Sequence, residues 1–382
     1  MTVISTGAGA AQQVQGVRIR RSGNLLELAG PDGGPLPEDV RRALEPFLSY
    51  EHKKFLFGLD RIGHDGRQRK VEVTHKQLYR YDQHGRMVMG FGLLSRARDA
   101  LQAARVPVAA YVVKQPPDHP RPDRYDVDKG RILHHFSYRP RQEECVDAVI
   151  KNECGVVWAV TGFGKMVMIA MVCLAFPNAR IAIVTKRLRL VNKLRQFLLK
   201  YIPSVGQVDG GHKKKGRVTV YSAASLAHSS FDEDVVLCDE GHELLADEAS
   251  STLARYRHAR MYTFTASPRG RLDGADIRLE SLFGRPIFYL PYPEAVKLGL
   301  VVPIRVEWAD VCLDRNPCGG MEDVRKKRWG LWQNDGRNQV IADKALSFGD
   351  DEQVLVTVET IEHAIHLRKF LPGFTLVLDA HT

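Results

Sequence analysis

Five short apolar runs, separated by segments with helical periodicity, constrain the fold of this chain more than any other feature. The runs are Gly155–Val160, Ile181–Thr185, Val218–Tyr221, Val235–Cys238 and Met261–Thr265. A strand that is apolar on both faces belongs in a sheet that helices cover on both sides, and regular alternation of strands with helices favours a parallel arrangement. We therefore predict an α/β domain with a mostly parallel sheet over residues 136–303.

The residues that precede this domain follow other patterns. Residues 1–15 are small and polar and are expected to form a disordered tail. Residues 16–114 combine short strand patterns with helical ones, as in a small accessory α+β domain. Residues 115–135 are rich in proline and charge and are predicted to be a linker.

A second α/β unit is predicted to begin near the end of the chain. Residues 304–350 are expected to connect to it, and it occupies residues 351–382. In it we predict a strand at Val354–Val358, a helix at Ile361–Phe370 and a strand at Thr375–Leu378. These elements are too few to close a domain, so the second unit is predicted to be incomplete.

Composition narrows the classes of protein to consider. Hydrophobic residues make up 44% of the 382 residues, which argues against disorder throughout the chain. No apolar run approaches the roughly 20 residues that cross a bilayer, so no membrane partner is expected. The amino terminus lacks the pattern of a secretory signal, and the six cysteines form no C-x-x-C pair. A cytoplasmic location is therefore predicted.

The charge of the chain favours a polyanionic partner. It carries 55 Lys and Arg against 45 Asp and Glu, and the first 136 residues hold 22 basic and 15 acidic side chains. Basic segments bind nucleic acid through the release of counterions from phosphates. In the accessory domain, a face for duplex or branched nucleic acid is our hypothesis, carried by Lys53, Lys54, Arg67, Arg69, Lys70, Lys76 and Arg80.

A glycine-containing loop, from Thr161 to Met166, joins the first apolar run to an apolar helical segment. Glycines let backbone N–H groups surround phosphate, and Lys165 is placed to reach the outer phosphates. Two residues depart from the usual P-loop pattern. Ala159 replaces the first glycine, and Met166 replaces the Ser or Thr whose hydroxyl binds Mg²⁺, for which a thioether is a poor ligand. Alone, this loop is equally consistent with an ordinary glycine turn.

A pair of acidic residues supplies the second half of a nucleotide site. The run Val235–Cys238 ends in Asp239-Glu240-Gly241-His242. Asp239 is predicted to hold Mg²⁺, and Glu240 to orient and activate the attacking water. A solvated acidic loop is the alternative, but such a loop need not follow four apolar residues. Together with Lys165, these two carboxylates predict nucleotide hydrolysis.

The motifs, in this order, resemble those of superfamily 2 helicases of the DEAD/DEAH-related type, which include UvsW-like phage helicases and type III restriction subunits. The resemblance implies a RecA-like fold and implies that Arg139 and Gln142 recognise adenine. It implies phosphate binding by Thr161, Gly162, Phe163, Gly164, Lys165 and Met166. It also implies contacts to a nucleic-acid strand from Lys186, Arg187 and Ser222. Coupling of hydrolysis to strand binding is implied for His242, Thr265 and Ser267.

The resemblance implies ATP and Mg²⁺ as cofactors, DNA rather than RNA as partner, and the cytoplasm of a bacterium or a phage-infected host as location. The sequence departs from the family pattern because it contains no counterpart of motifs V and VI. The missing lobe is expected to lie beyond a truncation or in a second chain. Alone, this chain is expected to bind ATP and nucleic acid, to hydrolyse slowly and not to separate strands.

Two other classes of function stay open at this point. One is a nucleotide-responsive module that binds nucleic acid without useful catalysis, which Met166 and the missing motifs favour. The other is a P-loop enzyme that acts on a small molecule, although that class does not account for Thr265-Ala266-Ser267.

Overall fold

The computed structural model describes residues 16–55, 71–114, 125–270, 273–311, 326–349 and 351–377. These described residues divide into two compact units, of which the first runs to Pro303 and the second from Ile304. Several predictions concern positions outside the described residues: the tail at 1–15, the first part of the linker at 115–124, Arg67, Arg69, Lys70 and the side chain of Lys54.

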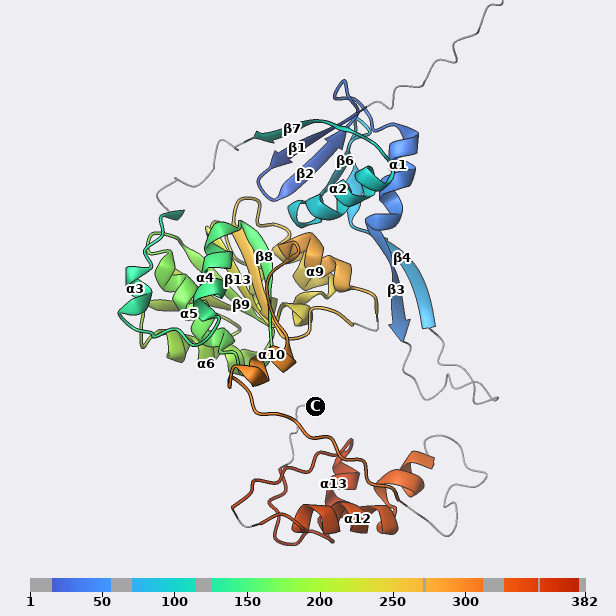
Figure 1. Ribbon diagram of the computed structural model, residues 1–382, viewed down its shortest axis with the longest axis vertical. Helices are drawn as coiled ribbons and strands as arrows, with labels where there is room; N and C mark the ends of the chain where they lie inside the picture. The colour runs from blue at the N-terminus through green and yellow to red at the C-terminus, as the bar shows by residue number, and fades with distance from the viewer. Residues whose placement is uncertain are drawn as a thin grey trace, which may run out of the picture. The chain divides into compact units, whose positions relative to one another are not determined.

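The first unit contains an eight-stranded sheet, of which β8, β9 and β13 are labelled in Figure 1. Its strand order is β11-β10-β12-β9-β13-β14-β8-β15. Neighbouring strands are parallel, except that β10 and β11 are antiparallel. The strands are β8 (Cys154–Ala159), β9 (Ile181–Thr185), β10 (Val205–Val208), β11 (Lys213–Lys214), β12 (Val218–Ser222), β13 (Val235–Asp239), β14 (Arg260–Thr265) and β15 (Pro286–Leu290). The five predicted strands are confirmed to within one residue at each end, and the predicted α/β class is confirmed with them.

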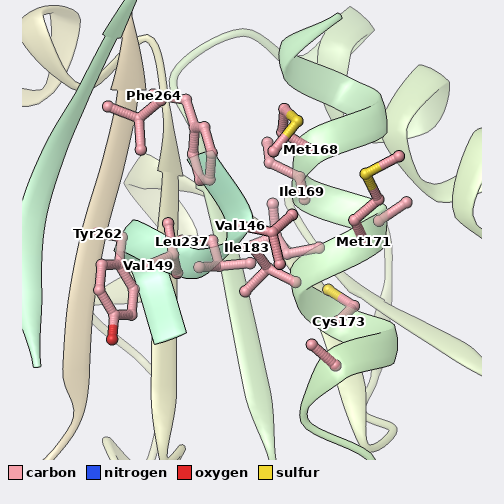
Figure 2. Close-up of a cluster of buried hydrophobic side chains, with 14 of the residues drawn as sticks. Val146, Val149, Met168, Ile169, Met171, Cys173, Ile183, Leu237, Tyr262 and Phe264 are labelled. Carbon is pink, nitrogen blue, oxygen red and sulfur yellow. The ribbon is translucent and has the colours of Figure 1, made fainter. Parts of the chain in front are cut away.

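Helices cover both faces of this sheet, as the two-sided apolar strands predict. They are α3 (Gly130–Leu133), α4 (Gln142–Lys151), α5 (Lys165–Ala175), α6 (Leu188–Leu198), α7 (Ala223–Leu226), α8 (Asp247–Leu253), α9 (Asp276–Phe283) and α10 (Tyr292–Lys297), with the 3-10 helix η5 (Gly241–Leu244). One core lies between the sheet and α4, α5 and α6, and a second lies on the opposite face beneath α7, α8 and α9. Figure 2 shows part of the first core, where Met168 and Ile169 of α5 lie near Ile183 and Leu237 of the sheet. Among the described residues, no helix is long and apolar enough to cross a membrane.

The carboxyl end of α5 is held by a guanidinium group. Arg217, just before β12, donates hydrogen bonds to the carbonyl oxygens of Cys173, Phe176 and Ala179 at 3.0–3.4 Å. Burial lowers the pKa of Arg217 from its usual value. These carbonyls have no partner within the helix, so the guanidinium satisfies groups that would otherwise be buried without hydrogen bonds.

A smaller α+β region precedes the large sheet, as predicted. Its five-stranded sheet has the order β5-β6-β2-β1-β7, and β3 pairs with β4 in a separate antiparallel ribbon. The elements are β1 (Val17–Ser22), β2 (Leu25–Ala29), α1 (Glu38–Leu44), η1 (Glu45–Phe47), β3 (Ser49–Phe55), β4 (Val71–Gln77), β5 (Tyr79–Tyr81), β6 (Met87–Gly90), η3 (Phe91–Leu93), α2 (Leu94–Ala103) and β7 (Val108–Lys114). Its core packs leucine, valine and methionine side chains of β1, β2 and β6 against α1 and α2.

The accessory region packs directly on the large sheet domain. The Asn24 side chain donates to the carbonyl oxygens of Tyr256 and Ala259 at 3.0 and 2.8 Å. A Cβ atom at Gly92 would collide with the carbonyl oxygen of Glu280, so only glycine permits this approach to α9. Residues 125–135 of the predicted linker also pack on the domain, because Ile132 is fully buried in the first core.

The second unit contains helices α12 (Asp335–Leu346) and α13 (Ile361–Leu367) and a π-helical segment, η6 (Arg328–Trp332). The prediction of a helix from Ile361 is confirmed. The prediction of strands is wrong for the described residues at 354–358 and 375–377, which form no ladder. Val354, Val356 and Val358 do pack on a small apolar cluster while Leu355 is 85% exposed, so the alternation is present. A strand also needs a hydrogen-bonded neighbour, which the described part of this unit does not supply.

We predict that Arg217→Met destabilises the first unit by about 1–3 kcal/mol, since carbonyl groups at the end of α5 lose their donors. Urea unfolding followed by circular dichroism measures the difference. Lys214→Met, which removes an exposed positive charge three residues earlier, is the matched control and should leave the midpoint unchanged. Equal midpoints for the two variants would contradict the role given to Arg217.

Candidate functional site

The predicted site residues follow the carboxyl ends of the parallel strands. The glycine loop follows β8, Lys186 and Arg187 follow β9, and Ser222 ends β12. Asp239 and Thr265 end β13 and β14. Because these strands are parallel members of one sheet, their carboxyl ends meet at one edge, where open α/β sheets bind their ligands.

The glycine loop has the backbone of a phosphate-binding turn. Gly162 and Gly164 have φ values of 93° and 92°, which side chains rarely adopt, and Gly164 is the N-cap of α5. Phe163 is fully buried and stacks on Phe288 with the ring centroids 5.5 Å apart. The Phe163 side chain therefore anchors the loop, and only its backbone is placed to meet a phosphate.

Lys165 lies beside the acidic pair, as predicted. Its Nζ is 2.7 Å from Oε1 of Glu240. Asp239 is 7% exposed, and burial raises its pKa to about 6, with a further increase from the charge of Glu240 and a decrease from Lys165. Glu240 has φ 50°, a left-handed conformation that turns the chain sharply after β13.

These residues fit a nucleotide triphosphate with Mg²⁺. The Lys165 ammonium is buried and, although it lies at ion-pair distance from Glu240, has no hydrogen bond of normal geometry. A buried ammonium without a hydrogen bond is poorly satisfied, and phosphate oxygens would supply acceptors. No group of three metal-ligating side chains occurs among the described residues, so Asp239 would hold the ion together with phosphate oxygens and water. Such sparse protein ligation is the usual arrangement for Mg²⁺ in nucleotide sites.

Gln142 and Arg139 lie against the glycine loop. Gln142 is buried, its Oε1 accepts from the backbone N–H of Arg139, and its Nε2 donates to the carbonyl oxygen of Phe163 at 3.0 Å. The Arg139 guanidinium donates at 3.4 Å to the carbonyl oxygens of Gly162 and Leu300. Both side chains thus position the loop.

The three predicted coupling residues form one hydrogen-bonded group. Nδ1 of His242 lies 2.7 Å from Oγ1 of Thr265, which also accepts from the backbone N–H of Ser267 at 3.1 Å. The same Nδ1 lies 3.4 Å from Oε2 of Glu240. The turn after β14 is therefore connected, through His242, to the carboxylate predicted to activate water.

The predicted strand-contacting residues differ in their exposure. Lys186 and Arg187 are exposed after β9, and Arg187 forms an ion pair with Glu243. Ser222 is 2% exposed, and its Oγ accepts from the backbone N–H of Ser225 as the N-cap of α7. The Ser222 side chain is thus buried and caps α7, and its contact with a strand stays a prediction.

Met166 is half-buried and packs against the first core. The side chain that replaces the usual hydroxyl is therefore partly withdrawn into the apolar interior. Met166 could contact phosphate through its backbone N–H group, but its side chain offers no ligand for Mg²⁺, because a thioether is a poor donor for a hard cation.

Two features of the site have no counterpart in the sequence prediction. Arg141 has φ 67° and forms ion pairs with Glu144 and with Glu294 of α10. Glu243, the acidic residue after His242, receives the ion pair from Arg187. The pair of Arg141 with Glu294 and the pair of Arg187 with Glu243 each join charges distant in the sequence, and a charged residue beside a motif is the only signal that the sequence offers for them.

The chain is similar to known proteins in sequence over residues 135–270 and in fold over most of its length. Residues 135–270 match the family model described as type III restriction enzyme, res subunit. Among curated proteins, none matches significantly. The UvsW helicase from bacteriophage T4 has a similar fold in two crystal structures, each 14% identical in sequence. One gives a TM-score of 0.50 and covers 71% of this chain and 99% of that chain, and the other gives 0.52 and covers 94% and 73%.

The structural matches show the RecA-like helicase fold, and the family-model match spans the glycine loop, the acidic pair and the turn after β14. Residues 135–270 are therefore similar to a family that the motifs predict, and the chain shares the fold of the UvsW helicase.

Proposed function

We propose that this protein is an ATP-dependent motor of the helicase type, which hydrolyses ATP to move on or remodel DNA. The observation that carries the proposal is the cluster of Lys165, Asp239 and Glu240 at the carboxyl edge of the sheet, connected through His242 to Thr265. The similarity of the fold to that of a helicase supports the same proposal, and so does the excess of basic over acidic residues in the chain.

The residues of the site suit distinct steps of hydrolysis. The loop backbone and Lys165 would hold the phosphates, while Arg139 and Gln142 would lie beside the base. Asp239 is the carboxylate placed for Mg²⁺, which when bound neutralises charge on the phosphate oxygens. As Lys165 turns from Glu240 to phosphate, Glu240 is freed to accept a proton from the attacking water.

Coupling to a strand is proposed for the residues around this centre. His242, Thr265 and Ser267 would relay the state of the nucleotide through their hydrogen bonds. Lys186 and Arg187 would contact the phosphates of the strand, since both are exposed at the same edge of the sheet. Contacts to phosphate do not distinguish DNA from RNA, so the proposal of DNA rests on the family resemblance.

A second candidate function is a nucleotide-responsive module that binds nucleic acid without useful turnover. The observation that favours it is Met166, which removes a Mg²⁺ ligand and directs its side chain to the core.

We predict that ATP hydrolysis is stimulated by single-stranded DNA and that Glu240→Gln lowers the stimulated rate by about 10²–10⁴, the usual contribution of a general base. Phosphate release with and without an oligonucleotide measures both effects. Glu248→Gln, the same change at an exposed acid on α8, is the control and should leave the rate intact. Absent hydrolysis would favour the second candidate, and hydrolysis indifferent to DNA would favour an enzyme for small molecules.

Met166→Thr should lower the Mg²⁺ concentration for half-maximal hydrolysis by about tenfold, since a bond to a charged partner contributes roughly 1.5 kcal/mol. Titration of Mg²⁺ at saturating ATP measures the shift. Met166→Leu keeps the apolar contact with the core without adding a ligand, so it should match the wild type. A Thr variant that also matches the wild type would show that the hydroxyl has no role at this metal.

Asp239→Asn should stabilise the nucleotide-free protein at pH 7.5 by up to about 3 kcal/mol. The pKa of Asp239 is about 6 in the folded protein against 3.8 for the ordinary group, so protonation favours folding. The destabilisation by the charge is absent below about pH 4, grows as pH rises to about 6 and is then constant.

Urea unfolding at pH 4 and pH 7.5 without Mg²⁺ measures this difference. Asp247→Asn provides a contrast of opposite sign, because an ion pair with Arg278 lowers the pKa of Asp247. An Asp239→Asn variant that is less stable than the wild type at pH 7.5 would contradict the role of burial.

A further inference from the structure

Glu243 connects the acidic turn to the residues that follow β9. It lies in η5, one residue after His242, and its backbone N–H donates to the carbonyl oxygen of Glu240 at 2.8 Å. Its Oε1 accepts from Nη2 of Arg187 at 2.7 Å. The strands β9 and β13 that precede these residues are parallel neighbours, so the ion pair joins the segments that follow two adjacent strands.

The two partners differ in their accessibility. The Arg187 side chain is 68% exposed, whereas the Glu243 side chain is 21% exposed and belongs to a short, tightly hydrogen-bonded turn. Lys186, the neighbouring cation, has no ion pair within the described part of the chain. Of the two basic residues placed to meet a strand, only Arg187 already has an anionic partner.

A phosphate group would compete with Glu243 for this guanidinium. Carboxylate and phosphate oxygens accept hydrogen bonds from the same N–H groups of the arginine guanidinium, so the two anions compete for one binding position. Glu243 therefore occupies the place that a strand phosphate would take on Arg187.

We propose that Glu243 is a positioning residue that mimics strand phosphate, holding Arg187 until a nucleic-acid phosphate displaces it. This inference rests on the proposed function. When phosphate displaces Glu243, Arg187 exchanges one ion pair for another. Glu243, which belongs to the turn that carries Glu240, then loses its partner. Strand binding and the geometry of the hydrolytic carboxylate are linked through this exchange.

The linkage has a direct consequence for affinity. Glu243→Gln removes the competing charge and leaves Arg187 available, so single-stranded DNA should bind about two- to fivefold more tightly, the range expected for an exposed ion pair. Arg187→Gln should weaken binding and reduce the salt slope by roughly one unit. In the double variant the change at Glu243 should have no effect, because its target is gone.

Fluorescence anisotropy with a labelled single-stranded oligonucleotide, without nucleotide and at fixed salt, measures all four proteins. The DNA concentration for half-maximal ATP hydrolysis should fall in Glu243→Gln in parallel with its dissociation constant, which a purely structural residue would not produce. Glu248→Gln carries the same change in net charge on an exposed position and should leave DNA affinity as in the wild type.

The outcomes separate this inference from the proposed function. Unchanged or weaker DNA binding by Glu243→Gln overturns the inference. The inference also fails if Glu243→Gln still tightens DNA binding in a protein whose Arg187 is already replaced. It fails too if Glu248→Gln tightens DNA binding to the same extent. A wild-type protein that binds no single-stranded DNA overturns the proposed function together with it.

Discussion

The ion pair between Lys165 and Glu240 is the interaction on which the proposed chemistry depends. It joins the helix after β8 to the turn after β13, although β14 lies between these strands in the sheet. Because the strands are parallel, the carboxyl ends of β8 and β13 lie at the same edge of the sheet. Burial of the charged groups there costs solvation free energy. The raised pKa of Asp239 shows this cost, because desolvation outweighs the favourable charge of Lys165. Because the buried charges destabilise the site without a ligand, binding of phosphate and a divalent cation would stabilise it by neutralising them.

The apolar interior holds this charged cluster in place. Helix α5 carries Lys165 at its first residue and is buried along most of its length, with Arg217 satisfying carbonyls at its far end. Phe163 anchors the loop from below by stacking on Phe288. These contacts fix the conformation of the loop, in which Gly162 and Gly164 adopt left-handed backbone conformations. The N–H groups of the loop are therefore positioned before a ligand binds.

Much of this arrangement follows from sequence patterns, because strands and helix starts are encoded locally. The five apolar runs identify strands, and their order brings Lys165, Asp239, Glu240, His242 and Thr265 together. Hydrogen-bond partners are not encoded in this way. Neither the burial of Ser222 as a helix cap nor the ion pair of Arg187 with Glu243 follows from spacing, since each depends on a second segment. The valines of residues 354–358 show the same limit: alternation is local, whereas a ladder needs a partner strand.

The accessory region packs on the segment that follows Thr265-Ala266-Ser267. Helix α9 begins nine residues after Ser267, the last residue of the Thr265-Ala266-Ser267 turn, and Gly92 meets its carboxyl half at Glu280. Arg96 also forms an ion pair with Glu280, and the backbone N–H of Lys53 donates to the carbonyl oxygen of Asp273. The β3–β4 ribbon and α2 thus contact the chain on both sides of the start of α9. These contacts hold the accessory region and the large sheet together in one compact unit, so the segment between β14 and α9 is packed against both.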